Sequence, residues 1–249
     1  MGEGATTVTV VTWNVQGSAG LDVAGVADVI EGVAPDVFAL QEIGWWQSLR
    51  LARRLGMRRR WAFKHYRWPG PEGLAVLTPH RIAGSRRFVL RRAPWWNWRR
   101  RVAIYTDIDR QGIHFGVINV HLSPHDHGDD RSREATIVVD VARQQSRLPV
   151  IAGDCNDVSD GPGPSDLCAA GWADAWALDR LASVDGSTNW TAGQRRGRPP
   201  SQRLDYVFAP PGWAVVDAAV LASVDRFDWF AARSDHLPVL AVLEPPPHE

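Results

Sequence analysis

The stretch that decides the fold is Leu-Pro-Val-Ile-Ala-Gly-Asp-Cys-Asn-Asp, residues 148–157. Its apolar half, 148–152, has the length and composition of a buried strand, and polar residues begin directly after it at Gly153-Asp154. A lone aspartate after a strand is usually a turn residue. The same arrangement recurs along the chain, however, and none of these strand ends carries Lys or Arg. The polar residues at these ends are Asn14, Glu42, Asn119 with His121, Asp154 with Asn156, Asp205, and Asp235 with His236.

Strand and helix patterns alternate between these positions. Helices are predicted where apolar residues recur at helical spacing, and strands where short apolar or β-branched runs end at turn residues. The expected helices are 21–33, 45–55, 131–145 and 165–170; the expected strands are 7–13, 37–40, 59–65, 73–78, 86–90, 102–108, 113–121, 148–152, 204–208, 214–221 and 237–243. This order predicts an α/β fold: one domain over residues 1–249, with two packed sheets, outer helices and a flexible Pro-rich tail at 245–249.

Composition excludes several classes of protein. The 249 residues are 45% hydrophobic and 22% charged, so the chain can bury a full core without disulfides or structural metals. The two cysteines, Cys155 and Cys168, are too few for a disulfide framework. No apolar run is long enough for a transmembrane helix, and the N-terminus lacks a signal-peptide pattern. We therefore expect a cytoplasmic protein, although a leader removed earlier would leave secretion open.

The net charge of zero conceals a strongly basic segment. Residues 50–101 contain 16 basic residues and one acidic residue, a formal charge of +15, and the rest of the chain is acidic. Cations and aromatics are mixed at 58–68 and 86–101, which suits phosphates and unpaired bases. The same composition suits an anionic lipid surface. A third interpretation is a solvated arginine face, with Trp95, Trp96 and Trp98 packed in a core or a dimer contact.

The strand-end residues indicate a hard metal and acid–base chemistry. Carboxylate and amide oxygens without thiolates favour Mg²⁺, Mn²⁺ or Ca²⁺ over Zn²⁺. Two histidines beside several carboxylates can transfer protons near neutral pH. Together these groups suit metal-assisted attack of water on a phosphate ester.

Six motifs in order resemble the endonuclease/exonuclease/phosphatase superfamily, whose members share the DNase I-like four-layer α/β sandwich. They span nearly the whole chain, and although each alone is weak, six in the family order are highly specific. The motifs are TWNVQG at 12–17, LQE at 40–42, NVHL at 119–122, IAGDCND at 151–157, RLDYVF at 203–208 and SDHLPV at 234–239.

The resemblance implies roles for the residues at the metal. Glu42 is expected to be the main ligand of Mg²⁺ or Mn²⁺, with Asn14 as a second ligand or near neighbour. Asp235 is expected to be a further carboxylate on the metal side. Asp154 is expected to orient or deprotonate the attacking water, and Asn156 to contact the phosphate or the metal.

The resemblance also implies the acid–base and substrate residues. His236 is expected to be the acid–base histidine, oriented by Asp205. His121 is expected to contact the phosphate or protonate the leaving group, and Asn119 is expected to support it as a substrate-binding residue. In the fold that the resemblance implies, the segment between the LQE and NVHL motifs contributes to one rim of the catalytic cleft. Arg99, Arg100 and Arg101 of this segment are therefore expected to bind the substrate.

Three features depart from the family pattern or leave alternatives open. Cys155 stands where the family usually has a bulky apolar residue, and we expect it to be a buried packing residue. His121 replaces the tyrosine of the abasic-site endonucleases, which argues against that branch. His125 and His127 could form a second metal site or belong to a solvated loop.

The sequence thus predicts a metal-dependent phosphodiesterase, with nucleic acid as the expected substrate and an anionic lipid surface as the alternative. The rival enzyme is a sphingomyelinase-like phospholipid hydrolase or an inositol-phosphate hydrolase of the same superfamily. A non-catalytic polyanion-binding module is the rival from another class, and the complete set of site residues argues against it. The sequence leaves the oligomeric state open.

Overall fold

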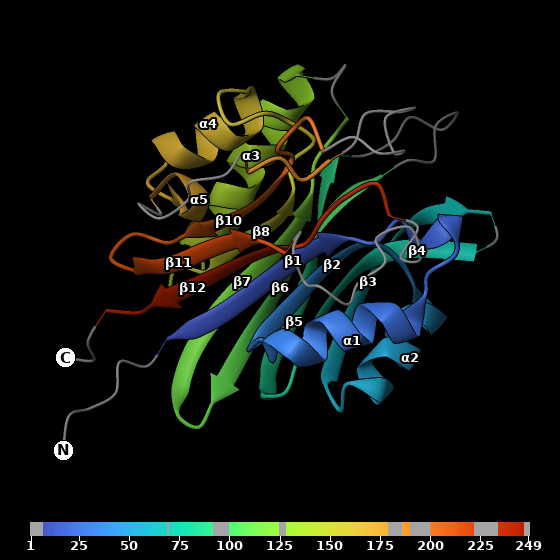
Figure 1. The fold of residues 1–249 in the computed structure, drawn as a ribbon. Helices are drawn as coiled ribbons and strands as arrows, with labels where there is room; N and C mark the ends of the chain where they lie inside the picture. Colours follow the sequence, from blue (N-terminus) through green and yellow to red (C-terminus); the bar gives the residue numbers. More distant parts are fainter. Residues whose placement is uncertain are drawn as a thin grey trace.

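Two six-stranded mixed sheets form the centre of the protein in a computed structural model, which describes residues 7–68, 70–91, 100–124, 128–178, 186–189, 200–221 and 234–246 (Figure 1). The first sheet has the order β11 (Ala214–Val220), β12 (Val239–Glu244), β1 (Val8–Asn14), β2 (Val37–Gly44), β4 (Gly70–Thr78), β3 (Arg58–Arg67). The second has the order β5 (Arg81–Arg91), β6 (Arg101–Arg110), β7 (Ile113–His121), β8 (Val150–Asp154), β10 (Asp205–Ala209), β9 (Ala173–Asp174). Parallel pairing joins β1 to β2 and β7 to β8.

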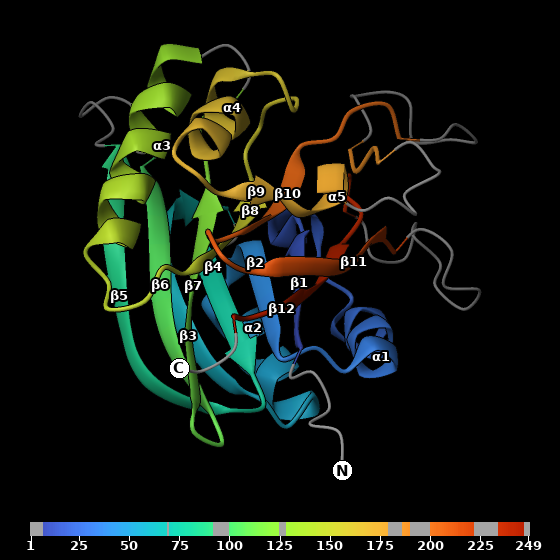
Figure 2. The same ribbon diagram turned by 90° about the vertical axis from the view of Figure 1, so that its left-hand side faces the viewer.

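Helices cover the outer faces of the two sheets. A 3-10 turn, η1 (Gly17–Ala19), precedes α1 (Val23–Val33), which lies with α2 (Trp45–Arg54) against the first sheet. The helices α3 (Gly128–Arg143) and α4 (Pro162–Ala169) lie against the second sheet (Figure 2), and the short α5 (Ala175–Leu178) follows β9. The expected four-layer sandwich of two packed sheets flanked by helices is therefore confirmed.

Strand alternation explains the layers. Along β1, Val8 and Val10 face the second sheet, whereas Val11 and Trp13 face the helices. In β8, Val150 and Ala152 face inward and Ile151 faces α3 and α4. Because side chains alternate along a strand, each apolar strand fills two layers of core. One apolar layer lies between the sheets, and one lies under each pair of helices.

The element predictions hold, with shifted boundaries. The strands β3, β4 and β5 after α2 and the hairpin of β6 and β7 lie where the sequence predicts them. Helix α4 begins at Pro162, earlier than expected, because proline fits the first helical position, where no N–H is needed. Strand β12 begins at Val239 rather than at 237. The short η1, β9 and α5 were not predicted.

Several expectations concern residues outside the described part of the chain. They are Trp95, Trp96, Trp98, Arg99, His125, His127 and residues 247–249 of the tail. Cys155 is buried in the core beside α3 and α4, as expected of a packing residue. Among the described helices, none has the length and apolar character needed to cross a membrane.

Candidate active site

The inward faces of the central strands change from apolar to polar toward one end of the two sheets. In β7 the inward series is Val117, Asn119, His121, and in β8 it is Val150, Ala152, Asp154. Strand pairing brings these ends together, because His121 is in register with Asp154 across β7 and β8, and Asp154 with Asp205 across β8 and β10. The predicted catalytic residues His121, Asp154 and Asp205 therefore lie together at the polar end of the interface between the two sheets.

Asp205 and His236 form a buried hydrogen-bonded pair. The Oδ2 atom of Asp205 accepts hydrogen bonds from His236 Nδ1 and from Thr188 Oγ1, each at 2.7 Å. Burial by itself would lower the pKa of His236, but the carboxylates of Asp205 and Asp154 raise it to about 10. At neutral pH His236 therefore carries a positive charge.

The loop that carries His236 is attached to β1. Trp13 donates its indole N–H to the His236 carbonyl at 2.8 Å, and the His236 N–H is bonded to Ser234 Oγ at 3.0 Å. Ser234 in turn donates to the Asn14 carbonyl. These bonds hold a loop residue against the strand end with the precision that catalysis requires.

Asp154 is the hub of the site. Its Oδ2 accepts a hydrogen bond from Asn14 Nδ2 at 2.9 Å and lies 3.6 Å from His121 Nε2 and 3.9 Å from His236 Nε2. Its Oδ1 accepts from the Asn156 N–H at 2.8 Å. Burial raises the pKa of Asp154, and the His236 charge opposes that effect. Asp154 thus contacts or approaches residues from several of the motifs.

Glu42 reaches the site through an irregularity in β2. The pairing of β2 with β4 shifts register between Leu40 and Ile43, and Glu42 has a φ of 53°. A left-handed conformation is costly for a residue with a Cβ, and such residues cluster at functional sites. Glu42 Oε1 lies 4.0 Å from His121 Nε2, and Oε2 is 3.3 Å from Arg67. Burial raises the pKa of Glu42, while Lys64 opposes the shift.

Lys64 in β3 and Glu72 in β4 are among the residues of the site that were not predicted from the sequence. Both are buried, and Lys64 Nζ lies 3.1 Å from Glu72 Oε1 and 3.3 Å from His121 Nδ1. Because an ammonium only donates, His121 Nδ1 accepts, so the ring proton is on Nε2. Burial and then Lys64 lower the pKa of His121 well below its usual value, which keeps the ring neutral.

The alternation of β3 could have revealed Lys64. Ala62 faces the second sheet, and Lys64 is two residues further along the same strand, so the charge points inward. In the sequence, Lys64 is surrounded by arginines and aromatics, so it resembles the other cations of the basic segment.

Asn119 is placed differently from the prediction. It is fully buried, its Nδ2 donates to the carbonyls of Leu40 and Ala75 at 2.9 Å, and its Oδ1 accepts from Gln41 at 2.7 Å. The assignment of Asn119 to substrate binding is therefore corrected: its amide is consumed in joining the two sheets beneath the site.

The basic residues at the start of β6 also differ from one another. Arg100 is exposed, but Arg101 is buried with its Nη1 unpaired among the described residues, and burial lowers its pKa. These two arginines therefore do not share one solvated surface.

Asp235 and Asn156 lie at the rim. Asp235 Oδ2 accepts from Gln16 Nε2 at 3.2 Å, and Oδ1 is 3.9 Å from His236 Nε2. Asn156 has a φ of 50°, and its side-chain amide donates to the Leu122 carbonyl at 3.0 Å. Asp235 is thus near the site, whereas the Asn156 amide is partly engaged with the backbone.

The metal-binding capacity of the site is visible in its donors. Among the described residues, Asp154, Asp205 and His236 have ligand atoms within 4.8 Å of one another. The buried Oδ1 of Asp205 has no hydrogen-bond partner in the described part of the chain. An unpaired buried carboxylate oxygen is costly, and a cation would relieve that cost. The arrangement could hold a divalent ion and move protons beside it.

Known proteins resemble the chain in sequence and structure. The model of the Endonuclease/Exonuclease/phosphatase family matches residues 11–236, whereas no curated protein matches the chain. An endonuclease/exonuclease/phosphatase from Beutenbergia cavernae has 27% identity and a TM-score of 0.75, over 96% of this chain and 72% of that one.

Two further solved structures show likeness of fold alone. The human Nocturnin catalytic domain with bound sulfate has 19% identity and a TM-score of 0.73, over 96% of this chain and 94% of that one. The mannosyl-6-phosphatase of Bacteroides thetaiotaomicron has 19% identity and a TM-score of 0.76, over 95% and 99%. The match to the family model confirms the resemblance seen in the six motifs: the chain belongs to the Endonuclease/Exonuclease/phosphatase family.

Proposed function

We propose that this protein is a divalent-metal-dependent phosphodiester hydrolase that cleaves nucleic acid. The observation that carries the proposal is the meeting of residues from the six motifs around Asp154. Its carboxylate is bonded to Asn14 and lies 3.6 Å from His121 and 3.9 Å from His236. Beside it, Glu42 and Asp205 supply two more carboxylates of the same site.

The residues fit a hard cation such as Mg²⁺ or Mn²⁺. Glu42, Asn14 and Asp235 offer carboxylate and amide oxygens, the donors that these ions prefer. We assign the tighter group of Asp154, Asp205 and His236 to proton transfer, because Asp205 Oδ2 accepts the hydrogen bond of His236 Nδ1 at 2.7 Å and so orients the ring toward Asp154. A bound ion would screen the phosphate charge and stabilise the leaving oxygen.

The protein side chains would divide the remaining work. Asp154, whose pKa burial raises, is a stronger base than an exposed aspartate, and we assign it to the attacking water. His236, held by Asp205, would stabilise the phosphate charge and transfer a proton. His121, neutral with its proton on Nε2, would donate a hydrogen bond to the phosphate or leaving oxygen. Asn156 would contact the phosphate or the metal from the rim.

The edges of the two sheets support a polyanionic substrate. β3 and β5 are edge strands, and Arg87 of β5 donates to the Phe63 carbonyl of β3 at 3.0 Å, so the two edges lie together. Among their exposed arginines, Arg81 is paired with Asp109 and Arg67 with Glu42. Exposed arginines along one edge attract phosphates with little dependence on sequence. The exposed arginines of the two strands are Arg58, Arg60, Arg67, Arg81, Arg86 and Arg87.

One observation favours the phospholipid alternative. Tyr66 and Trp68 are 76% and 92% exposed on the β3–β4 hairpin, on either side of Arg67. Exposed aromatics beside a cation also suit the headgroup region of a membrane. The inositol-phosphate alternative has no comparable supporting observation among the described residues.

A metal-dependent activity screen tests the proposal. Plasmid DNA, RNA, sphingomyelin, inositol phosphates and bis(p-nitrophenyl) phosphate are each incubated with Mg²⁺, with Mn²⁺ and with EDTA. We expect cleavage of DNA or RNA that EDTA abolishes. Turnover of sphingomyelin or inositol phosphate without cleavage of nucleic acid would replace the proposal by its rival. Polyanion binding without turnover of any substrate would favour the non-catalytic module.

A further inference from the structure

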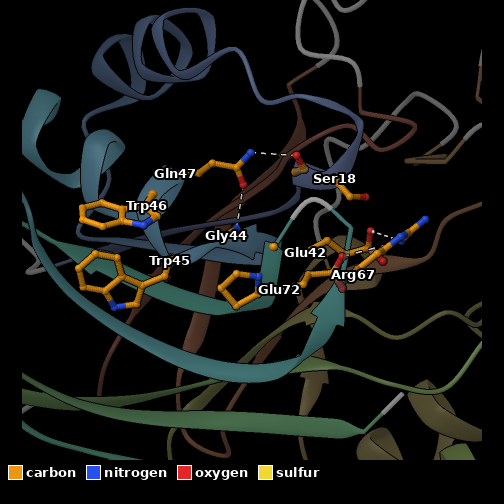
Figure 3. Close-up of a pocket in the computed structure, with 11 residues that line it drawn as sticks. Ser18, Glu42, Gly44, Trp45, Trp46, Gln47, Arg67 and Glu72 are labelled. Carbon is orange, nitrogen blue, oxygen red and sulfur yellow. Dashed lines mark hydrogen bonds and ion pairs between the residues drawn. The ribbon is translucent and has the colours of Figure 1, made fainter. Parts of the chain in front are cut away.

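A pocket opens beside Glu42. It has a volume of about 190 Å³ and is lined by described residues of η1, β2, α2 and the β3–β4 hairpin. Figure 3 shows the indoles of Trp45 and Trp46 on one side of the pocket, and Glu42 with Arg67 on the other. A group bound here would therefore lie next to a phosphate bound at the cation that Glu42 is proposed to hold.

The aromatic wall of the pocket is held in place before any ligand arrives. Arg59 lies over the Trp45 ring, 4.8 Å from its centre, and donates to Ser48 Oγ at 2.7 Å. Trp45 meets Trp46 at 89° with their centres 4.6 Å apart. Trp46 is 67% exposed despite this contact. Exposure of the large apolar surface of an indole to water is costly, and a stacked ligand would recover that cost.

Most of the polar atoms around the pocket already have hydrogen-bond or ion-pair partners within the protein. Gln47 Oε1 accepts from the Gly44 N–H at 2.8 Å, and its Nε2 donates to the Gly17 carbonyl at 2.8 Å. Arg67 lies with Glu42 and Glu72 at one end of the pocket. The pocket therefore offers a ligand mainly aromatic surface, with charged groups at one end.

Gly17 has a steric reason to be glycine. A Cβ there would stand 2.5 Å from Gln47 Oε1 and 2.7 Å from the Glu42 carbonyl. The absence of a side chain at Gly17 therefore lets the backbone of η1 approach α2 and the Glu42 carbonyl of β2 closely.

We infer that this pocket binds one nucleobase of the substrate, on the nucleoside adjoining the scissile phosphate. The inference rests on the proposed phosphodiesterase activity and adds the part of the substrate that is recognised. The volume is below the ~300–1,000 Å³ of pockets for drug-sized ligands, so it suits a single ring system. A sugar ring would leave several hydroxyls without partners in so apolar a site, and each would lose its water. A base presents two apolar faces, which stack on aromatic side chains.

Such a site selects unpaired bases. A base paired and stacked inside a duplex cannot enter the pocket without leaving its helix, which costs free energy. The enzyme should therefore prefer single strands, loops and frayed ends to intact duplex.

The test uses three single-stranded dinucleotides with one phosphodiester each: thymidylyl-thymidine, and the same molecule with an abasic tetrahydrofuran unit on the 5′ or on the 3′ side. In each, water attacks phosphorus and one P–O bond breaks, so the products differ only in the missing base. Wild-type kcat/KM should fall roughly fivefold to 150-fold for one of the two abasic substrates, the range that base–aromatic stacking supports.

In Trp46→Ala, the ratio of kcat/KM for thymidylyl-thymidine to kcat/KM for the abasic substrate should fall close to one. In Trp46→Phe, most of the wild-type ratio should be restored. The matched control is Trp68→Ala, because Trp68 is more exposed than Trp46 but does not line the pocket. This control should keep the wild-type ratio. Thermal unfolding of all variants checks that the fold is retained.

A second measurement needs no catalysis. Calorimetric titration with AMP and with ribose 5-phosphate in EDTA should show tighter binding of AMP, and Trp46→Ala should abolish the difference. Equal binding of the two ligands, or equal cleavage of intact and abasic dinucleotides, overturns the nucleobase site. If bis(p-nitrophenyl) phosphate is still hydrolysed with Mg²⁺ or Mn²⁺ in that case, the phosphodiesterase proposal survives. Absence of metal-dependent hydrolysis of any diester would instead overturn the proposed function.

Discussion

Replacing Asp205 by asparagine should uncouple His236 from its charge partner. Wild-type Asp205 accepts the His236 Nδ1 proton at 2.7 Å, and the carboxylates around the ring raise its pKa to about 10 against the effect of burial. Asparagine keeps the shape and removes the charge. Only the carboxylates of Asp154 and Asp235 would then oppose the effect of burial, and the pKa of His236 should fall toward the ordinary value of about 6.5. An NMR titration of the imidazole protons measures it, and the resonance absent from His236→Gln gives the assignment.

The same substitution has a consequence for stability. The pKa of His236 is higher in the folded than in the unfolded state, so protonation of His236 stabilises the fold below about pH 6.5. This contribution is lost as the pH rises through the folded-state pKa. The free energy of unfolding of the wild type should therefore decrease between about pH 6.5 and 10, relative to Asp205→Asn. At ~1.4 kcal/mol for each pH unit of separation, the difference is on the order of several kcal/mol. Urea unfolding across this range is the assay, and parallel curves for the two proteins would refute the reasoning.

Kinetics test whether the pair acts as one unit. His236→Ala should reduce the rate at least ~10²-fold, the lower end for general acid–base catalysis. Adding Asp205→Ala should cost little more, because Asp205 works through the ring that has already been removed. Strictly additive losses would show that the two residues act independently.

Three further predictions concern the metal, the polyanion and the backbone. Glu42→Gln should retain the fold but weaken Mg²⁺ or Mn²⁺ binding and activity, and full EDTA-sensitive hydrolysis by this variant would exclude Glu42 as a ligand. Replacing Arg86 and Arg87 with glutamine should make the dependence of log affinity for duplex DNA on log salt less steep. The slope should change by about 0.9 for each phosphate that these arginines neutralise in the wild type. An unchanged slope would show that the polyanion binds elsewhere. Gly153→Ala should lower the free energy of unfolding by at least ~1–3 kcal/mol, because residue 153 has a φ of 148° and the alanine Cβ would clash with the Val120 carbonyl. Chemical denaturation measures this, and wild-type stability would contradict the prediction.

The order of elements could be predicted from the sequence, because it depends on local patterns. The apolar run before Asp154, the turn residues between β6 and β7, and the helical spacing before Val33 each act within a few residues. The six motifs indicated the family for the same reason, because each is a short stretch of neighbouring residues that can be recognised from residue type alone. Asp205 with His236 was predicted as a pair only through that resemblance.

Which side chains meet inside was decided by pairing between distant strands. Asn119 resembles the other strand-end residues in the sequence, yet it joins the sheets because the Leu40 and Ala75 carbonyls lie opposite it. Arg101 belongs to a basic run, but in the folded chain it is buried. No local pattern contains the carbonyls of another strand.

The pocket beside Glu42 is also a product of tertiary structure. Its walls come from segments around Ser18, Trp46 and Arg67, which are far apart along the chain and share no sequence pattern. Lys64 and Glu72 become site residues for the same reason, since the β3–β4 hairpin carries them under His121. The sequence alone determined the elements, their order and the chemistry at the strand ends, because these depend on neighbouring residues. Only the packing of the two sheets determined which of those groups are buried, paired or open to substrate, because burial and electrostatic interaction depend on distance in space.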